Sequence, residues 1–268
     1  MDSDTDILAS IDALIMDMDG VLWRDNDPLP GLAPFFGYLH AEAIPYALAT
    51  NNSSKTPAEY AAKLARFGVT VAPERIITSS VAAARFLQKR KPGARVFAVG
   101  MPGMFRTLEA HGFTLTDTDV DFVVVGIDWE VTYAKIATAS RLIRQGATFI
   151  GTNPDLTFPT PDGLVPGAGS IIAAVQAASE TTPIMIGKPE TAMFEMALDF
   201  LGAPRARTAM LGDRLETDIL GGQRAGLRTI LVCTGIHTRA DVAASGVQPD
   251  LIFDDLPDFL RRWQAARP

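Results

Sequence analysis

The sequence predicts an α/β fold, a Rossmann-like parallel sheet in a three-layer sandwich with helices, carrying an inserted α/β cap domain. Two observations lead to this prediction. Short apolar runs that end in glycine or polar residues alternate with helical stretches along the whole chain. The pattern also begins afresh after the first third of the chain and continues for about 100 residues, which is long enough for a domain.

The composition limits the classes of protein to which the chain can belong. Its 268 residues are 47% hydrophobic and carry a net charge of −7, as expected for a globular protein with a sizeable core. An acidic chain is not expected to bind nucleic acid or an anionic membrane. No apolar run has the length of a membrane span, and the acidic N-terminus is unlike a signal peptide. With one cysteine, Cys233, we expect a cytoplasmic protein without an intrachain disulfide.

The first apolar run, 14–16, ends in two carboxylates, Asp17 and Asp19, which Gly20 follows at once. The run has no polar alternation, as expected for a strand buried on both faces. Open parallel sheets bind their ligands at the carboxyl ends of the strands. Two carboxylates that both stay ionised at close range need a cation between them, and oxygen ligands favour Mg²⁺. Two solvated aspartates in a turn are the alternative interpretation.

The next apolar run, 45–49, ends in polar residues and leads into a helix. These residues are Thr50, Asn51, Asn52, Ser53 and Ser54. A strand end that precedes a helix N-terminus offers oriented N–H donors to an anion. Thr50 and Asn51 lie nearest the strand tip, so we favour them as ligands of a phosphate. For Asn52 and the two serines, binding and plain helix capping are equally good interpretations.

The other expected elements continue the same alternation. Helices are expected over 32–42, 57–67 and 81–89, with a strand over 76–78 and a polar loop over 23–31. The cap, 80–182, should hold strands over 95–99, 122–127 and 148–150 and helices over 102–110, 133–145 and 170–178. The rest of the core, which comprises 1–79 and 183–268, should hold strands over 183–186, 208–211, 228–232 and 251–253 and helices over 190–201 and 255–266, with one more helix ending near 225.

Two of the later strand ends also carry charged groups. Lys188 follows the strand over 183–186, and Asp213 and Asp218 follow the strand over 208–211. Because the tips of parallel strands share one edge of a sheet, we expect these groups to lie near the first ones. His237, in a loop near that edge, is more readily explained as a solvated loop residue than as a functional one. A cation site of Asp17, Asp19 and Asp213 would then adjoin an anion site of Thr50, Asn51 and Lys188.

Four segments, in this order, resemble the motifs of the haloacid dehalogenase (HAD) superfamily. They are Asp17-Met18-Asp19-Gly20-Val21-Leu22, Thr50-Asn51-Asn52-Ser53, Gly187-Lys188-Pro189, and Gly212 with Asp213, Thr217 and Asp218. More narrowly, the chain resembles the NagD/4-nitrophenylphosphatase-like branch (class IIA), which places a large C2-type cap between the second and third motifs. The segments 152–155 and 161–170 are similar to that branch too.

The resemblance implies a phosphatase that acts on small phosphate monoesters through an aspartyl-phosphate, with Mg²⁺ as its cofactor. Asp17 would be the nucleophile. Asp19 would protonate the leaving group and then activate water, and it would meet the metal through its backbone carbonyl. The resemblance also implies the roles of the other residues. Thr50 and Asn51, with Asn52 as a further candidate, would bind the phosphoryl oxygens, and Lys188 would neutralise the charge at the nucleophile and the phosphate. Asp213 would bind the metal, and Asp218 would support the metal's waters or Lys188.

Several alternatives stay open at this stage. The superfamily's dehalogenases lack the second carboxylate, so Asp19 favours a phosphatase or a phosphosugar mutase, and an inactive regulatory binding module is a third possibility. Sugar phosphates, nucleoside monophosphates and 4-nitrophenyl phosphate all share the reacting group. Substrate choice should lie in the cap, in the loops 128–130 and 155–162. In relatives the position of Phe158 faces the substrate, although a cap-core aromatic explains it equally well. Caps often pair in this family, which leaves a homodimer through the cap open.

Overall fold

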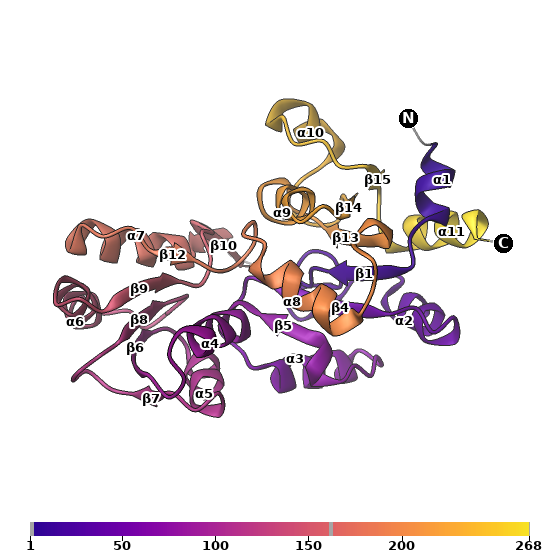
Figure 1. Ribbon diagram of the computed structural model, residues 1–268. Coiled ribbons are helices and arrows are strands. Elements are labelled where there is room, and N and C mark those ends of the chain that lie inside the picture. Colours follow the sequence, from indigo (N-terminus) through magenta and orange to yellow (C-terminus); the bar gives the residue numbers. More distant parts are fainter. Residues whose placement is uncertain (1–2, 161–162, 268) are drawn as a thin grey trace. The chain divides into compact units, whose positions relative to one another are not determined.

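The computed structural model describes residues 3–160 and 163–267 (Figure 1). The chain divides into two compact units. The first runs to Ala49 and continues over Ala61–Ile77 and from Phe194 onward, and the second consists of Thr50–Tyr60 and Thr78–Met193. The domain boundaries expected from the sequence, with a cap over 80–182, stay a prediction. Pro161 and Asp162, which belong to a segment singled out in the sequence, lie outside the described residues.

A six-stranded sheet organises the first unit. Its order is β15 (Leu251–Phe253), β14 (Arg228–Val232), β13 (Thr208–Gly212), β1 (Ala13–Met16), β4 (Tyr46–Thr50) and β5 (Ile76–Thr78). Strand β1 lies between β13 and β4 and pairs in parallel with both. All of its residues are buried, as the absence of polar alternation predicts for an inner strand. The predicted Rossmann-like α/β fold is confirmed.

Helices and a hairpin complete this part of the chain. The helices are α1 (Asp4–Ala9), α2 (Leu32–Ala41), α3 (Pro57–Arg66), α8 (Ala192–Leu201), α9 (Leu220–Arg224), α10 (Arg239–Ser245) and α11 (Leu256–Ala266). Short helical turns cover Pro73–Arg75 and Arg205–Arg207, and a turn of π-helix, Leu215–Ile219, precedes α9. The loop expected over 23–31 contains a two-stranded hairpin of β2 (Trp23–Arg24) and β3 (Asp27–Pro28).

The second unit is built on a five-stranded sheet in which all neighbouring strands are parallel. Its order is β12 (Ile184–Met185), β9 (Thr148–Gly151), β8 (Phe122–Val125), β6 (Arg95–Val99) and β7 (Thr114–Leu115). Its helices are α4 (Ser79–Arg90), α5 (Pro102–Ala110), α6 (Tyr133–Arg144) and α7 (Ala168–Ser179), and β10 (Thr157–Thr160) pairs with β11 (Gly163–Pro166) in an antiparallel hairpin.

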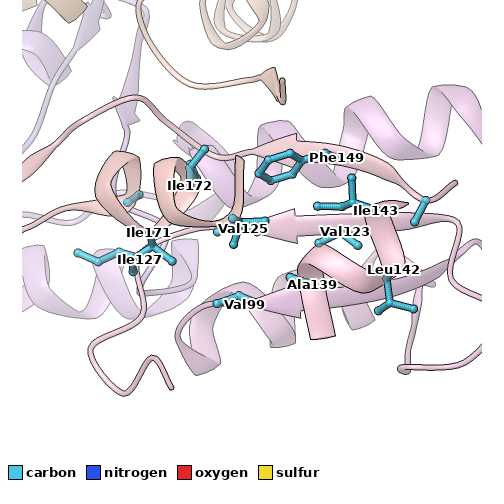
Figure 2. Packing of buried hydrophobic residues seen from close by; sticks show 13 residues of the cluster. Val99, Val123, Val125, Ile127, Ala139, Leu142, Ile143, Phe149, Ile171 and Ile172 are labelled. Atoms are coloured by element: carbon cyan, nitrogen blue, oxygen red, sulfur yellow. The ribbon is translucent and has the colours of Figure 1, made fainter. Parts of the chain in front are cut away.

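The hydrophobic core of this unit lies between the sheet and two of its helices. Figure 2 shows Val123 and Val125 of β8 packed with Ile143 of α6 and Ile172 of α7. Each of these side chains is buried. The second sheet therefore has a core of its own, as the restart of the strand-and-helix pattern predicts.

One expected strand belongs to a different sheet from the one predicted. From its place in the core, the run 183–186 is expected in the same sheet as the strand that ends at Asp17, but β12 pairs with β9 at the edge of the second sheet. The strand is two residues long, and Ile184 is 37% exposed. A short apolar run carries no local signal of which sheet it joins. The prediction places it in the first sheet because strands of that sheet follow it in the chain, and that prediction is wrong. Lys188 therefore does not follow a strand of the first sheet.

In the described part of the chain, no helix has both the length and the apolar character that crossing a membrane requires.

Candidate active site

Three buried carboxylates meet at the carboxyl ends of two adjacent strands. Asp17 follows β1 and Asp213 follows β13, and together with Asp218 they place one carboxylate oxygen each within 4.8 Å of the others. The three residues are 7%, 4% and 1% exposed. Ionised carboxylates this close repel one another, and a divalent cation between them removes that repulsion. The cluster could therefore hold a metal ion, and its oxygen donors suit a hard one.

Backbone amides hold the two later carboxylates in place. Oδ2 of Asp218 accepts hydrogen bonds from the N–H groups of Asp213 (3.2 Å) and Arg214 (3.1 Å), and Oδ2 of Asp213 accepts one from Ile236 (2.8 Å). The π-helical turn Leu215–Ile219 carries Asp218 back toward the end of β13. Such amide donors stabilise a carboxylate in one orientation, which a metal ligand requires.

Two glycines make room for the Asp213 side chain. Gly20 has a φ of +86°, which favours glycine, and a Cβ there would lie 2.5 Å from Oδ2 of Asp213. A Cβ on Gly235 would overlap the same carboxylate. These two positions, one after β1 and one after β14, therefore depend on the absence of a side chain.

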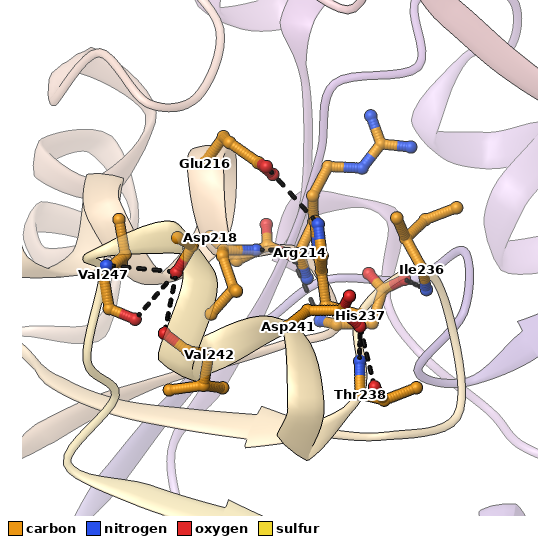
Figure 3. Close-up of polar contacts among 12 residues, drawn as sticks. Arg214, Glu216, Asp218, Ile236, His237, Thr238, Asp241, Val242 and Val247 are labelled. Atoms are coloured by element: carbon orange, nitrogen blue, oxygen red, sulfur yellow. Dashed lines mark hydrogen bonds and ion pairs between the residues drawn. The ribbon is translucent and has the colours of Figure 1, made fainter.

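His237 is part of the scaffold around Asp213 rather than a solvated loop residue. Its N–H donates to the backbone oxygen of Asp213 (3.1 Å), and its Nδ1 accepts from the N–H of Leu215 (3.2 Å). Its Nε2 lies 3.3 Å from a carboxylate oxygen of Glu216, and the side chain is 16% exposed. Figure 3 shows the contact between His237 and Glu216. The sequence carries no local pattern that separates this histidine from a solvated one.

Asp19 lies outside the three-carboxylate cluster that the described residues form, and it has its own support. Its Oδ1 accepts a hydrogen bond of 2.7 Å from the indole Nε1 of Trp23, which is fully buried in the hairpin. The ammonium of Lys63 lies 4.1 Å from the centre of the Trp23 ring and donates to the backbone oxygen of Asp25. The side chain of Asp19 is thus held by a buried aromatic ring that itself has a cation on its face.

The residues expected to bind phosphate lie at the start and near the end of the second unit. Thr50 ends β4 and is buried, and its hydroxyl accepts the N–H of Asn52 at 3.1 Å. The side-chain oxygen of Asn52 accepts the N–H of Ser54 at 3.0 Å, which forms an Asx turn in the loop before α3. Lys188 is 1% exposed, and its backbone is hydrogen-bonded to the side chain of Asn51. The structure therefore brings Asn51 and Lys188 together although 136 residues separate them in the chain.

The loop 128–130 follows β8 and presents an exposed tryptophan. Asp128 is buried, accepts the N–H of Glu130 at 2.9 Å and pairs with Lys135 at 2.8 Å. Between these fixed residues Trp129 is 56% exposed, and its ring centre lies 6.2 Å from that of Phe158. Phe158 also packs against the hydrophobic core of the second unit. It is therefore at least in part a core aromatic, as one of the two interpretations holds.

The chain matches two family descriptions, "Haloacid dehalogenase-like hydrolase" over residues 14–114 and "HAD-hydrolase-like" over 185–259. It is 38% identical over 250 residues to the acid sugar phosphatase of Staphylococcus saprophyticus, covering 93% of this chain and 96% of the relative. The acid sugar phosphatase of Staphylococcus aureus is 40% identical over 249 residues, covering 92% and 96%.

Solved structures show the same likeness. The 4-nitrophenylphosphatase of Thermotoga maritima superimposes with a TM-score of 0.91 at 36% identity, covering 95% of this chain and 98% of that one. NagD of Escherichia coli K-12 gives a TM-score of 0.84 at 35% identity, covering 91% and 96%. The chain belongs to the haloacid dehalogenase-like hydrolase family. It is a phosphatase, and its resemblance to the NagD/4-nitrophenylphosphatase-like branch is confirmed.

Proposed function

We propose that this phosphatase is Mg²⁺-dependent and hydrolyses small sugar phosphates through an aspartyl-phosphate on Asp17. The observation that carries the proposal is the cluster of three buried carboxylates, with oxygens within 4.8 Å of one another, directly after adjacent parallel strands. The names of the two staphylococcal relatives support sugar phosphates as the substrate class. The matching motifs over nearly the whole chain support the mechanism.

Asp17 and Asp19 divide the chemistry between them. A carboxylate oxygen of Asp17 bonds to phosphorus while the bond from phosphorus to the ester oxygen breaks, and Asp19 gives its proton to the departing alkoxide. Water then attacks the phosphorus of the aspartyl-phosphate, and Asp19 takes a proton from that water. Release of inorganic phosphate restores the carboxylate of Asp17. The hydrogen bond from Trp23 holds Asp19 in one orientation through both steps.

The metal would be held by Asp17 and Asp213, with Asp218 beside them. The residues fit the ion, because the donors are all carboxylate oxygens, and a Cβ at position 20 or 235 would occupy space that the Asp213 carboxylate needs. Bound there, Mg²⁺ would offset the negative charge of the carboxylates and of the phosphoryl oxygens. The backbone amides on Asp213 and Asp218 keep the ligands in place before the ion arrives.

Thr50 and Lys188 would bind the phosphoryl group. A hydroxyl can donate to a phosphoryl oxygen, and the ammonium of a buried lysine offsets its charge strongly because little water screens it. The side-chain oxygen of Asn52 accepts the N–H of Ser54 within the loop, so its contribution would be to the shape of that loop.

Substrate selection would lie with Trp129 and Phe158. Trp129 is exposed between two fixed residues, and an aromatic surface of this kind can contact the non-reacting part of a substrate. Trp129→Ala should change the ratio of kcat/KM between a hexose phosphate and 4-nitrophenyl phosphate by about fivefold or more. Tyr133→Ala, which removes an aromatic that is 87% exposed on α6, is the matched control and should leave the ratio unchanged.

The function is tested by phosphate release from a hexose phosphate, a nucleoside monophosphate and 4-nitrophenyl phosphate, with Mg²⁺ or with EDTA. Release should require Mg²⁺. The kcat/KM for the hexose phosphate should be higher than that for the nucleoside monophosphate. Asp17→Asn should lower the rate by about a thousandfold or more. Asp25→Asn, which neutralises an exposed carboxylate in the nearby hairpin, should be fully active. A preference for the nucleotide would refute the substrate class, and an active Asp17→Asn would refute the mechanism.

A further inference from the structure

We infer that Asn51 is a positioning residue for Lys188: its side-chain amide fixes the backbone of Lys188, and its side chain is not itself a ligand of the phosphoryl group. This role rests on the proposed function, in which Lys188 neutralises charge on the phosphoryl group. The expectation from the sequence, that Asn51 binds the phosphoryl oxygens, does not distinguish its side chain from its backbone, and the inference concerns the side chain alone.

The amide of Asn51 pairs with both backbone groups of Lys188. Its Oδ1 accepts the N–H of Lys188 at 2.8 Å, and its Nδ2 donates to the carbonyl oxygen of Lys188 at 3.0 Å. Both residues are buried, with exposures of 8% and 1%. A primary amide that meets the N–H and C=O of one residue in this way fixes its backbone at two points, which a single hydrogen bond cannot do.

Asp155 completes the hydrogen bonding of the same amide. Its Oδ2 accepts a hydrogen bond of 3.1 Å from Nδ2 of Asn51. An asparagine amide has two N–H donors, and the two are used by the carbonyl of Lys188 and the carboxylate of Asp155. The remaining group, Oδ1, is an acceptor and cannot bind a phosphoryl oxygen, which is an acceptor too. The side chain of Asn51 therefore offers no donor to a phosphoryl group unless one of these bonds breaks.

The backbone of Asn51 and of Gly187, the residue before Lys188, is also fixed by hydrogen bonds. The carbonyl oxygen of Asn51 accepts from Nδ2 of Asn153 at 2.7 Å and from the hydroxyl of Ser79 at 2.6 Å. The N–H of Gly187 donates to the oxygen of Thr152 at 2.8 Å. A Cβ on Gly187 would lie 2.5 Å from that oxygen and 2.6 Å from Oδ1 of Asn51, so the close approach depends on glycine. Asn51 is thus the centre of a hydrogen-bonded assembly that joins it to three other chain segments, Ser79, 152–155 and 187–188.

This assembly should affect catalysis because the lysine side chain is flexible, so the position of its charge depends on its backbone. The ammonium is a compact charge at the end of a flexible stem with four carbons, so its position depends on a fixed starting point. Charge stabilisation in a transition state requires groups that are already in place. Loss of the Asn51 amide should therefore lower kcat through Lys188.

A double-mutant cycle separates positioning from direct binding. Asn51→Ala, Lys188→Met and the double variant are compared for kcat on 4-nitrophenyl phosphate with Mg²⁺. Each single variant should lower kcat by about tenfold or more, and the double variant should match Lys188→Met within about twofold, since residues that act through one group are not additive. If the two losses multiply in the double variant, Asn51 acts independently of Lys188 and the inference is wrong.

Inorganic phosphate gives a second readout, which separates direct binding by the Asn51 side chain from an effect through Lys188. In the Lys188→Met background, adding Asn51→Ala should leave the inhibition constant of phosphate unchanged. A clear weakening there would show that the Asn51 side chain binds phosphate directly. Asn51→Leu, which has a similar shape and no charge but lacks the donors and the acceptor of the amide, allows the same cycle if the alanine variant does not fold.

The control keeps the two hypotheses distinguishable. Thr107→Ala removes a buried hydroxyl of the same unit, which donates to Gly103 at 2.8 Å, and it should keep the wild-type kcat. Wild-type activity in Lys188→Met would contradict the role of Lys188 in the proposed function. An inactive Lys188→Met together with a fully active Asn51→Ala would leave that function standing and refute the positioning role alone.

Discussion

The indole N–H of Trp23 donates a hydrogen bond of 2.7 Å to Oδ1 of Asp19. Trp23 is fully buried, and the ammonium of Lys63 lies 4.1 Å from the centre of its ring. The cation is attracted to the face of the indole, which helps to keep the ring in place. The proposed acid and base of the reaction is therefore held by a side chain that the hairpin after β1 supplies.

Trp23→Phe should lower kcat by about tenfold, because hydrogen bonds to charged groups contribute about 1.5–3 kcal/mol. The substitution keeps an aromatic ring in the core and removes only the donor and part of the ring. Steady-state kinetics on 4-nitrophenyl phosphate measure the effect. Trp263→Phe is the matched control, since the buried indole N–H of Trp263 has no hydrogen-bond partner among the described residues. Equal kcat values for the two variants would show that the Trp23 bond has no part in the reaction.

Gly235→Ala should abolish most of the activity, because its Cβ would overlap the carboxylate of Asp213. The carboxylate would have to move away from the ends of β1 and β13, and metal affinity should fall with it. Kinetics at a series of Mg²⁺ concentrations test this expectation. In Gly37→Ala the new Cβ meets nothing within 4 Å and lies in helix α2. That variant should be active and more stable by up to about 1 kcal/mol. A fully active Gly235→Ala would contradict the geometry described for Asp213.

Asp218→Asn should weaken Mg²⁺ binding by about 10–100-fold while the fold is kept. Asparagine can still accept the N–H groups of Asp213 and Arg214, but one negative charge leaves the cluster. The readout is the rise in melting temperature with added Mg²⁺, which does not depend on turnover. The midpoint of that rise should move to higher Mg²⁺ in the variant. An unchanged midpoint would exclude Asp218 from the support of the metal.

Stability should depend on pH through Asp121. The hydrogen bond from Lys91, together with the backbone N–H of Arg95, holds the pKa of Asp121 below its usual value of 3.8. A carboxylate with a lowered pKa in the folded state stabilises above its unfolded pKa, and that contribution is lost as pH falls through the folded pKa. Asp121→Asn should therefore lower the melting temperature at pH 7, by an amount worth at most about 1 kcal/mol for so exposed a pair. The difference should shrink as the pH falls through the lowered pKa of Asp121, and a difference that does not change with falling pH would contradict this origin.

The elements of the fold were largely predictable, because buried strands and their polar ends leave a local pattern. Asp17 and Asp213 could be placed together from sequence, since both follow inner strands of a parallel sheet. The position of β12 could not, because two apolar residues carry no preference for one sheet over another.

The finer features of the site depend on contacts between distant segments. Nothing near His237 in the sequence indicates that its ring accepts the N–H of Leu215. Asn51 follows a strand end and is easily interpreted as a phosphate ligand, yet its amide pairs with the backbone of Lys188. A sequence pattern indicates that a polar group lies at a site but does not indicate which partner uses its hydrogen bonds.

The most direct test of the account is chemical trapping of the aspartyl-phosphate during turnover. Borohydride reduces an acyl phosphate to an alcohol, so quenching the enzyme with borohydride in the presence of a hexose phosphate and Mg²⁺ should convert Asp17 to homoserine. Peptide mass spectrometry identifies the position, and Asp25→Asn should give the same product. We predict homoserine at position 17 and nowhere else. An unmodified Asp17 in enzyme that is turning over, or homoserine at another carboxylate, would contradict the proposed mechanism.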